Sequence, residues 1–407
     1  MPPLKGEVLA AQAVGFTDAD LGRSNQWRPT VVDRMRGSNR NRALPGGSKW
    51  VQAQPAIVHE KVKRMKTEVK KPDAAALREA GRLIREGSLV GFPTETVYGL
   101  GANALDEAAV RSIFEAKGRP GDNPLIVHVS CMEEILALID GEMPENARKL
   151  AEAYWPGPMT LILPKGERIP AAVTAGMDSV GIRLPSNEVA RALIREAGRP
   201  IAAPSANRSG RPSPTTAQHV LDDMDGRIPL ILDGGPCQVG LESTVVDARG
   251  EVPRVLRPGG VTPEMIARVC GAVEVDGAVM RPLKEGEKPR SPGMKYRHYA
   301  PVGELTLVEG APEAVAGKIC ALYDQAGEDA AILALPGHEH FYAGRRVFDL
   351  GDSDAVESVA AHLFAALRTL DDEHIRVIYS EAVDAEGLGL AVMNRLGRAA
   401  AFRIVKV

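Results

Sequence analysis

Apolar residues recur at helical spacing in several parts of the chain. Ala, Leu and Ile residues three and four positions apart predict a helix over 73–86. Asp106 can cap a second helix, because its carboxylate can accept hydrogen bonds from free N–H groups of the first turn. That helix carries Lys117 in its last turn and ends at Gly118. A further helix is expected over 133–139.

Short apolar runs between these segments predict β-strands. The expected strands cover 89–92, 125–129, 159–163, 180–184, 201–203, 230–232, 241–246 and 253–256. Strands that alternate with helices indicate an α/β layered domain. Because some strands follow one another without a helix between them, we predict a mixed sheet and not a purely parallel one.

The pattern changes near residue 270. Gly, Pro, Lys and Arg become frequent, a composition typical of a linker. Further strands (305–308, 331–335, 376–379) and helices (314–322, 356–370) then predict a second, smaller α/β domain. We therefore expect a first domain over 66–270, a linker over 271–303 and a second domain over 304–407.

Residues 1–64 follow no hydrophobic period. Four arginines between positions 34 and 42 lie among Asn, Ser and Gly residues. Three interpretations stay open: a disordered tail, a segment upstream of a true translation start at Met65, or a basic arm that contacts RNA.

Composition indicates a globular protein. The 407 residues suggest two domains, and the apolar content of 44% is enough for buried cores. Aromatic residues make up 4%, so the cores should consist of Ala, Val, Leu and Ile. A net charge of -3 gives no overall electrostatic case for nucleic-acid binding, although it leaves a local basic cleft open.

The cysteines and the apolar runs bear on location. The four cysteines lie far apart and form no C-x-x-C pair, so we expect no disulfide framework and no structural zinc site. No apolar run approaches the roughly 20 residues that cross a bilayer. The amino terminus also lacks the apolar core of a signal peptide. The sequence therefore predicts a cytoplasmic protein that does not enter the membrane.

The stretch from Phe92 to Gly101 is rich in hydroxyl groups and glycine. Thr94, Thr96 and Tyr98 alternate, so an extended chain would place their side chains on one side. Such a stripe is commonly a solvent-facing edge. Here it follows a buried strand, and strand ends are the usual ligand position in open α/β sheets.

Lys117 and Arg119 form a basic pair at a tight turn. Cations at a helix carboxyl end often only complement the helix dipole. Gly118 nevertheless turns the chain tightly between two cations of different character. Arg offers a planar fork to phosphate oxygens and Lys a compact charge, so the pair suits a triphosphate.

Arg183 stands between apolar neighbours in a predicted buried strand. A buried guanidinium needs an anion, either an internal carboxylate or the carboxylate of a substrate. His128, in another strand, can be a structural half-buried histidine or a ligand contact. The small polar candidates, each weak alone, are Ser179, Ser205, Asn207, Ser213 and Ser243.

Several known motifs are absent. The chain has no G-x-x-x-x-G-K-[ST] and no G-x-G-x-x-G after a strand. Ser205 has no G-x-S-x-G setting, so a hydrolase triad is unsupported. His338 and His340 flank Glu339 in a polar loop without a third ligand, which argues against a metal site there.

Six separate signatures nevertheless occur in order along the chain. They are Pro93-Thr-Glu-Thr-Val-Tyr-Gly-Leu-Gly101, Lys117-Gly-Arg119, Trp155-Pro-Gly-Pro158, Pro204-Ser-Ala-Asn207, Gly240-Leu-Glu-Ser-Thr244 and Leu256-Arg-Pro-Gly259. With them, the chain closely resembles the threonylcarbamoyl-AMP synthases, the YrdC-like enzymes of tRNA modification. The segment from Ser291 to Pro301 resembles the linker of the longer, two-domain form. The resemblance implies a twisted, mixed-sheet YrdC-like catalytic domain followed by a smaller Rossmann-like α/β domain.

The resemblance also implies roles for individual residues. A threonine pocket would be lined by Thr96, His128, Arg183, Ala203 and Ser243. ATP would be held by Arg119, Asn123, Ser179, Ser205, Ser213, Arg257 and Tyr296. The catalytic polar tetrad of the family would be Lys117, Arg119, Ser205 and Asn207. The linker segment from Ser291 is expected to act as a lid over the nucleotide.

The implied reaction joins L-threonine, bicarbonate and ATP into threonylcarbamoyl-adenylate and pyrophosphate. Mg²⁺ should accompany the ATP phosphates with few protein ligands, so no metal-binding residue is expected. A separate transferase complex would move the threonylcarbamoyl group onto tRNA, and no stable binding of nucleic acid is required. One rival is a YrdC-like module that binds RNA or tRNA without adenylation. A second, carbamoyl transfer in hydrogenase maturation, would need cysteine-rich zinc motifs, which the four scattered cysteines do not provide.

Overall fold

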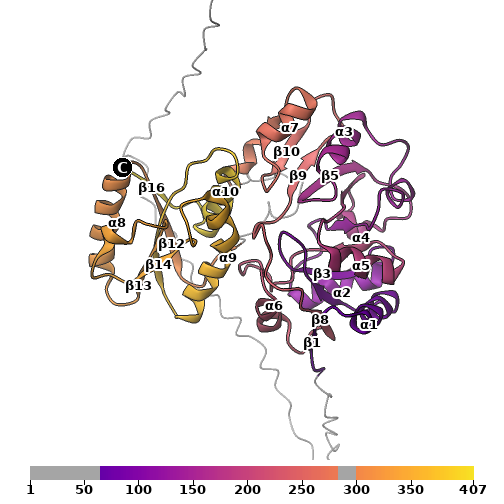
Figure 1. Cartoon of the computed structure of the whole chain (residues 1–407), viewed down its shortest axis with the longest axis horizontal. Helices are drawn as coiled ribbons and strands as arrows, with labels where there is room; N and C mark the ends of the chain where they lie inside the picture. The colour runs from indigo at the N-terminus through magenta and orange to yellow at the C-terminus, as the bar shows by residue number, and fades with distance from the viewer. Residues whose placement is uncertain (1–64, 283–298) are drawn as a thin grey trace, which may run out of the picture. The chain divides into compact units, whose positions relative to one another are not determined.

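The computed structural model describes residues 65–282 and 299–407. These residues form two sheets, each flanked by helices (Figure 1). The amino-terminal segment, for which three interpretations were open, lies outside the described residues.

The first sheet has 11 strands. In spatial order they are β1 (Glu68–Lys70), β8 (Leu230–Leu232), β2 (Val90–Phe92), β3 (Gly99–Asn103), β7 (Ile201–Ala203), β4 (Ile126–His128), β6 (Ser179–Arg183), β5 (Met159–Pro164), β9 (Thr244–Asp247), β10 (Arg254–Arg257) and β11 (Glu274–Val275). Antiparallel pairs such as β2 with β3 stand beside parallel pairs such as β4 with β6. The predicted mixed sheet is thus confirmed. β11 lies within the stretch expected as linker.

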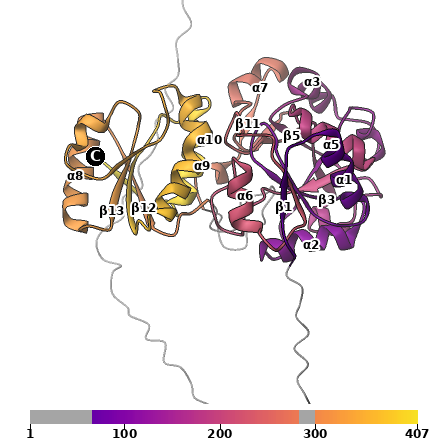
Figure 2. The same ribbon diagram turned by 60° about the horizontal axis from the view of Figure 1, so that its bottom comes forward.

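Helices cover both faces of this sheet. They are α1 (Ala74–Arg85), α2 (Glu107–Lys117), the 3₁₀ turn η1 (Ile135–Ala137), α3 (Glu145–Tyr154), α4 (Ala171–Thr174), α5 (Glu188–Ala197), α6 (Ala217–Met224), α7 (Pro263–Cys270) and the 3₁₀ turn η2 (Gly277–Val279). Helices α1 and α5 lie side by side (Figure 2) and share one apolar core with β2, β7 and β8. A larger core on the other side holds the apolar faces of α2, α3 and α6.

Two predicted helices begin where the sequence indicates. Asp73 accepts from the Ala76 N–H at 2.8 Å, and Asp106 accepts from the Ala108 N–H at 2.9 Å. Gly118 then ends α2 in the left-handed conformation, at a φ of 64°. The end of α2 therefore fixes where the loop that follows Gly118 begins.

Three other predictions differ from the structure. The expected helix over 133–139 is reduced to η1, because Glu134 bonds back to Ser130 and the chain then pairs Ile139 with Lys165. The segment 99–103, which is not among the expected strands, is the strand β3, and a Cβ at Gly99 would lie 2.9 Å from the Phe92 ring. The strand expected from residue 241 begins at Thr244, which leaves 241–243 as a loop.

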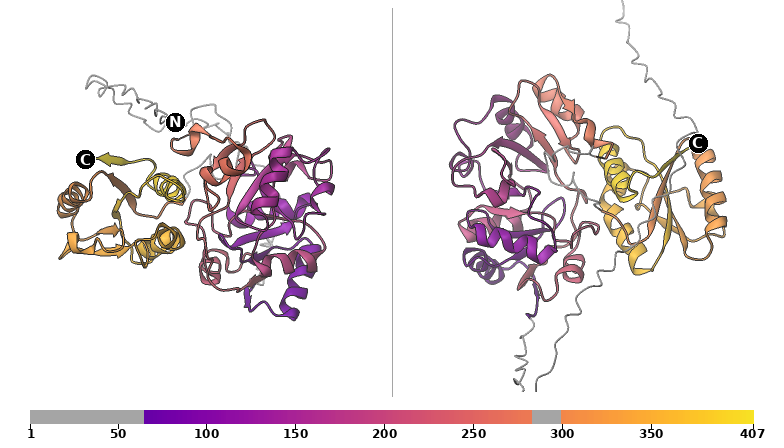
Figure 3. Two further views of the ribbon diagram at one scale, coloured as in Figure 1. Left: turned by 45° about the horizontal axis from the view of Figure 1, so that its top comes forward. Right: turned by 180° about the vertical axis from the view of Figure 1, so that it is seen from behind.

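The second sheet has 5 strands, all parallel. In spatial order they are β14 (Val347–Asp349), β13 (Ala330–Ala334), β15 (Val377–Glu381), β12 (Glu304–Glu309) and β16 (Ile404–Lys406). Its helices are α8 (Pro312–Ala326), the 3₁₀ turn η3 (Glu339–Tyr342), α9 (Val356–Asp372) and α10 (Gly389–Ala399). Figure 3 shows α8 on one face and α9 with α10 on the other, as two separate apolar clusters require. The predicted Rossmann-like second domain is confirmed.

Candidate functional site

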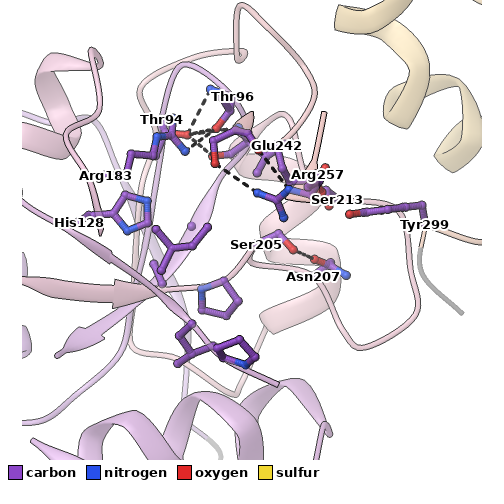
Figure 4. Close-up of a pocket in the computed structure, with 18 of the residues that line it drawn as sticks. Thr94, Thr96, His128, Arg183, Ser205, Asn207, Ser213, Glu242, Arg257 and Tyr299 are labelled. Atoms are coloured by element: carbon purple, nitrogen blue, oxygen red, sulfur yellow. Dashed lines mark hydrogen bonds between the residues drawn. The ribbon is translucent and has the colours of Figure 1, made fainter. Parts of the chain in front are cut away.

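A cavity lies at the middle of the first sheet, around strands β4, β6 and β7 (Figure 4). All five residues of the expected threonine set line it: Thr96, His128, Arg183, Ala203 and Ser243. So do five residues expected for ATP or catalysis: Arg119, Ser205, Asn207, Ser213 and Arg257. Segments far apart in the sequence thus meet around one space.

Arg183, at the end of β6, is a buried cation at one end of the cavity. It donates to the Thr96 hydroxyl at 2.9 Å, and its Nη2 lies 2.7 Å from Oε1 of Glu95. Burial alone would raise the pKa of Glu95, but the charge of Arg183 holds it below its usual range. The anion that the sequence required for Arg183 is therefore present inside the protein.

His128 is paired in register with Arg183 on the neighbouring strand. Its ring meets Phe92 edge-on, with 6.1 Å between the ring centroids. Burial, and next the charge of Arg183, lower the pKa of His128 to about 3, so the imidazole is neutral near pH 7. Its Nδ1 has no hydrogen-bond partner within 65–282 and 299–407. A neutral ring with a bare nitrogen can bind a hydroxyl group.

Lys117 supports the loop that carries Ser205 and Asn207. Its Nζ donates to the backbone oxygens of both residues, and Lys117 does not line the cavity. Burial, followed by the charge of Arg119, lowers the pKa of Lys117 well below its usual value. The Ser205 hydroxyl donates to the Asn207 side chain at 2.5 Å, and both side chains line the cavity. Lys117 therefore holds the backbone of the loop whose side chains line the cavity, without lining the cavity itself.

Arg257, at the end of β10, lines the cavity together with Ser243. Its Nε donates to the Ser243 carbonyl at 3.1 Å and its Nη2 to the Ser243 hydroxyl at 3.2 Å. That hydroxyl lies 2.8 Å from the Thr160 hydroxyl. These contacts keep a guanidinium beside the cavity, where an anion can reach it.

The remaining candidates lie elsewhere. Asn123 is fully buried, does not line the cavity, and neither polar atom of its amide has a partner in the described part of the chain. Ser179 borders a smaller adjoining hollow, which shares Leu125 and Ile126 with the main cavity. Tyr296 and most of the expected lid lie outside the described residues, so their roles stay predictions.

Two titratable residues that the sequence did not single out also line the cavity. Glu242 is a buried carboxylate inside the signature 240–244, and its charge next to Ser243 was the available signal. Tyr299 belongs to the linker segment and also lines the cavity. Tyr98 differs from expectation: its hydroxyl donates to the Gly235 carbonyl at 2.7 Å, so it does not share a polar stripe with Thr94 and Thr96.

Two kinds of feature are absent from the described residues. Within 65–282 and 299–407, no group of three or more His, Cys, Asp or Glu residues could hold a metal ion. No helix in the same ranges is long and apolar enough to cross a membrane.

Family models match nearly all of the described chain. Residues 82–259 match the Sua5/YciO/YrdC family, described as "Telomere recombination". Residues 261–401 match the "Threonylcarbamoyl-AMP synthase, C-terminal domain".

Individual relatives agree with the family models. Threonylcarbamoyl-AMP synthase of Pyrococcus abyssi is 50% identical over 331 residues, which are 81% of this chain and 96% of the relative. The Bacillus subtilis synthase is 47% identical over 81% of this chain and 94% of its own. The crystal structure of P. abyssi Sua5 complexed with L-threonine matches with a TM-score of 0.78 and 48% identity, over 84% of this chain and 99% of that one. This chain therefore belongs to the threonylcarbamoyl-AMP synthase family, in its two-domain form.

Proposed function

We propose that this chain condenses L-threonine, bicarbonate and ATP into threonylcarbamoyl-AMP and releases pyrophosphate. One observation carries the proposal: a single cavity joins an end suited to an amino acid with a wall of cations and hydroxyls suited to phosphates. The matched P. abyssi protein was crystallised with L-threonine, which supports the amino-acid end.

The threonine carboxylate would pair with Arg183, whose guanidinium also faces Thr96 and Glu95. The neutral ring of His128 could accept a hydrogen bond from the threonine hydroxyl without adding a second positive charge. Ala203 and Ser243 would close the pocket around the small side chain.

ATP would lie along the opposite wall. Arg119 and Arg257 would face its phosphates, because guanidinium groups match phosphate oxygens in geometry. Hydroxyl contacts would come from Ser205 and Ser213 in the cavity wall and from Tyr296 of the linker, whereas Asn123 and Ser179 do not line the cavity. In the polar tetrad, Arg119, Ser205 and Asn207 line the cavity, while Lys117 would act through the loop that it holds.

The chemistry needs no nucleophilic side chain. The unprotonated threonine amine attacks bicarbonate, water leaves, and a carbamate forms. A carbamate oxygen then attacks the α-phosphate of ATP, and the bond to the β-phosphate breaks as pyrophosphate departs. The protein would contribute position and positive charge, which are the main terms in such transfers.

Mg²⁺ would arrive with ATP as part of the substrate. Among the described residues lining the cavity, the carboxylate belongs to Glu242, which Arg395 and Ser213 already engage. A small number of protein ligands is expected for Mg²⁺, because this ion keeps most of its bound waters. The ion would neutralise phosphate charge.

The product would serve a separate transferase complex that modifies tRNA. Stable binding of nucleic acid by this chain is not required for that role. All four cysteines are unpaired, which supports a reducing compartment such as the cytoplasm.

The test is pyrophosphate release from MgATP, measured with threonine and bicarbonate each omitted in turn. We expect release to need both. Release that is independent of threonine would overturn the proposal, and so would RNA binding in a chain that never releases pyrophosphate.

A further inference from the structure

Glu242 is an acidic group in the wall of a cavity proposed to hold a polyanion. Its side chain is 8% exposed, and it precedes Ser243 in the loop before β9. One carboxylate oxygen accepts from the Ser213 hydroxyl, and the other accepts from Arg395 Nε at 2.8 Å. A buried carboxylate is unfavourable unless it is paired, so Ser213 and Arg395 determine the orientation of the Glu242 carboxylate.

Arg395 reaches this site from the second domain. It belongs to α10, whose residues are buried on all sides, and its own exposure is 0%. Besides the Glu242 carboxylate, its guanidinium donates to the Pro258 carbonyl at 2.8 Å, to the backbone carbonyl of Glu242 at 3.2 Å and to the Asn394 side chain at 2.9 Å. Three of these four acceptors belong to the loops around the cavity. Arg395 is therefore held by the loops that carry Glu242 and Pro258, although it does not line the cavity itself.

The charge of a second cation, Arg257, also acts on this carboxylate. Burial raises the pKa of Glu242, but Arg395 and then Arg257 lower it below its usual value. In the described part of the chain, however, Glu242 forms an ion pair with Arg395 and none with Arg257. Arg257 instead bonds to Ser243 and stays on the cavity wall (Figure 4).

We propose that Arg395 is a positioning residue for ATP. By holding Glu242, it fixes the Ser213 hydroxyl and keeps the carboxylate away from Arg257, whose guanidinium then remains available to a phosphate. Without Arg395, the carboxylate would be left to Arg257, which is bonded to the adjacent residue Ser243, and their pairing would compete with ATP. The inference rests on the proposed function and assigns the second domain a part in nucleotide binding.

Arg398 offers a matched control. It lies one turn further along α10, is also buried, and donates to the Ala278 carbonyl at 3.1 Å, outside the cavity wall. Replacing it also removes a buried cation from α10. It does not remove the partner of Glu242.

The experiment measures the dissociation constants of MgATP and of L-threonine by calorimetric titration of the full chain, and a melting curve checks that each variant is folded. Arg395→Gln should weaken ATP binding by about tenfold or more, as expected when one partner of a buried charge pair is lost. Threonine binding should change less than about threefold, within the range of indirect effects. The double variant Glu242→Gln with Arg395→Gln should bind ATP more tightly than Arg395→Gln alone, because no carboxylate is left to attract Arg257. Arg398→Gln should bind ATP like the unmutated chain.

Two outcomes would overturn the inference: ATP binding as weak in Arg398→Gln as in Arg395→Gln, or a double variant no better than Arg395→Gln. If Arg395→Gln does not fold, Arg395→Lys replaces it, because Lys keeps the charge and loses the forked contact. A loss confined to ATP then supports the inference, and an equal loss for both ligands contradicts it. If the unmutated chain binds ATP but releases no pyrophosphate, the proposed function fails while these comparisons still decide the role of Arg395.

Discussion

Arg183 and Glu95 form an ion pair inside the first domain, with 2.7 Å between Nη2 and Oε1 and side chains that are 4% and 6% exposed. Arg346 and Glu373 form a pair of similar length, 2.6 Å, with side chains that are 41% and 52% exposed. The two pairs differ in how much water surrounds them. Removing one partner of a buried pair leaves a charge that water cannot reach, whereas a surface charge stays hydrated.

We therefore predict that Glu95→Gln lowers the free energy of unfolding by about 3–5 kcal/mol. Glu373→Gln should lower it by less than about 1 kcal/mol. Urea denaturation of both variants measures the difference. Equal losses would mean that the buried pair is not the source of stability.

Lys117 gives a prediction about position. Lys117→Met keeps an unbranched side chain, one atom shorter, but removes the hydrogen bonds to the Ser205 and Asn207 carbonyls. Because a shift of about 1 Å in a catalytic group can cost about 100-fold, we expect kcat/KM for pyrophosphate release to fall by about that factor. Lys70→Met is the control, since Lys70 pairs with Glu68 away from the cavity. A normal rate in Lys117→Met would show that the loop holds its shape without this lysine.

Gly259 gives a prediction about space. A Cβ at Gly259 would lie 2.5 Å from the Thr244 nitrogen and 2.6 Å from the Glu242 carbonyl, both of them backbone atoms. Gly259→Ala must therefore move the loop that carries Glu242, and we expect both the melting temperature and pyrophosphate release to fall. Gly317→Ala, in α8 with nothing within 4 Å of the added atom, should instead stabilise the protein by up to about 1 kcal/mol. Similar melting temperatures for the two variants would contradict the clash.

His128 predicts a pH dependence. Its pKa is lowered from 6.5 to about 3 in the folded chain, chiefly by burial. Between these values the unfolded chain binds a proton that the folded chain does not, so the free energy of unfolding falls as pH falls. The contribution is at most about 1.4 kcal/mol per pH unit. His128→Asn should flatten the slope of unfolding free energy against pH between about 6.5 and 5. An unchanged slope in urea titrations at several pH values would count against a buried neutral ring.

The sequence predicted much of this arrangement for definite reasons. Asp106 and Gly118 are strong end signals, so the bounds of α2 were predictable. The charge of Arg183 among apolar neighbours required an anion, and Glu95 supplies it. The strand β3 was not among the predicted strands, because glycine is rare in strands, whereas here Gly99 and Gly101 make room for the ring of Phe92.

Other features had no local signal. Helix α10 is buried although it carries Asn394, Arg395 and Arg398, polar residues that the sequence alone would place on a solvent-facing side. Arg395 and Glu242 are 153 residues apart, and nothing near either one in the sequence points to the other. Such a pair becomes visible when the fold brings both groups to one place.

The strand order of the first sheet has a consequence for synthesis on the ribosome. β7 (Ile201–Ala203) lies between β3 and β4 in the sheet, although it follows both strands in the sequence. The helices α3, α4 and α5 lie between β4 and β7 along the chain. The two earlier strands thus emerge with unpaired edges facing a place that is still empty. A nascent chain must keep these edges from wrong partners until the later strand arrives, and pairing across such long separations is slow. The middle of the sheet, where the ligands would bind, therefore needs protection while the protein is made.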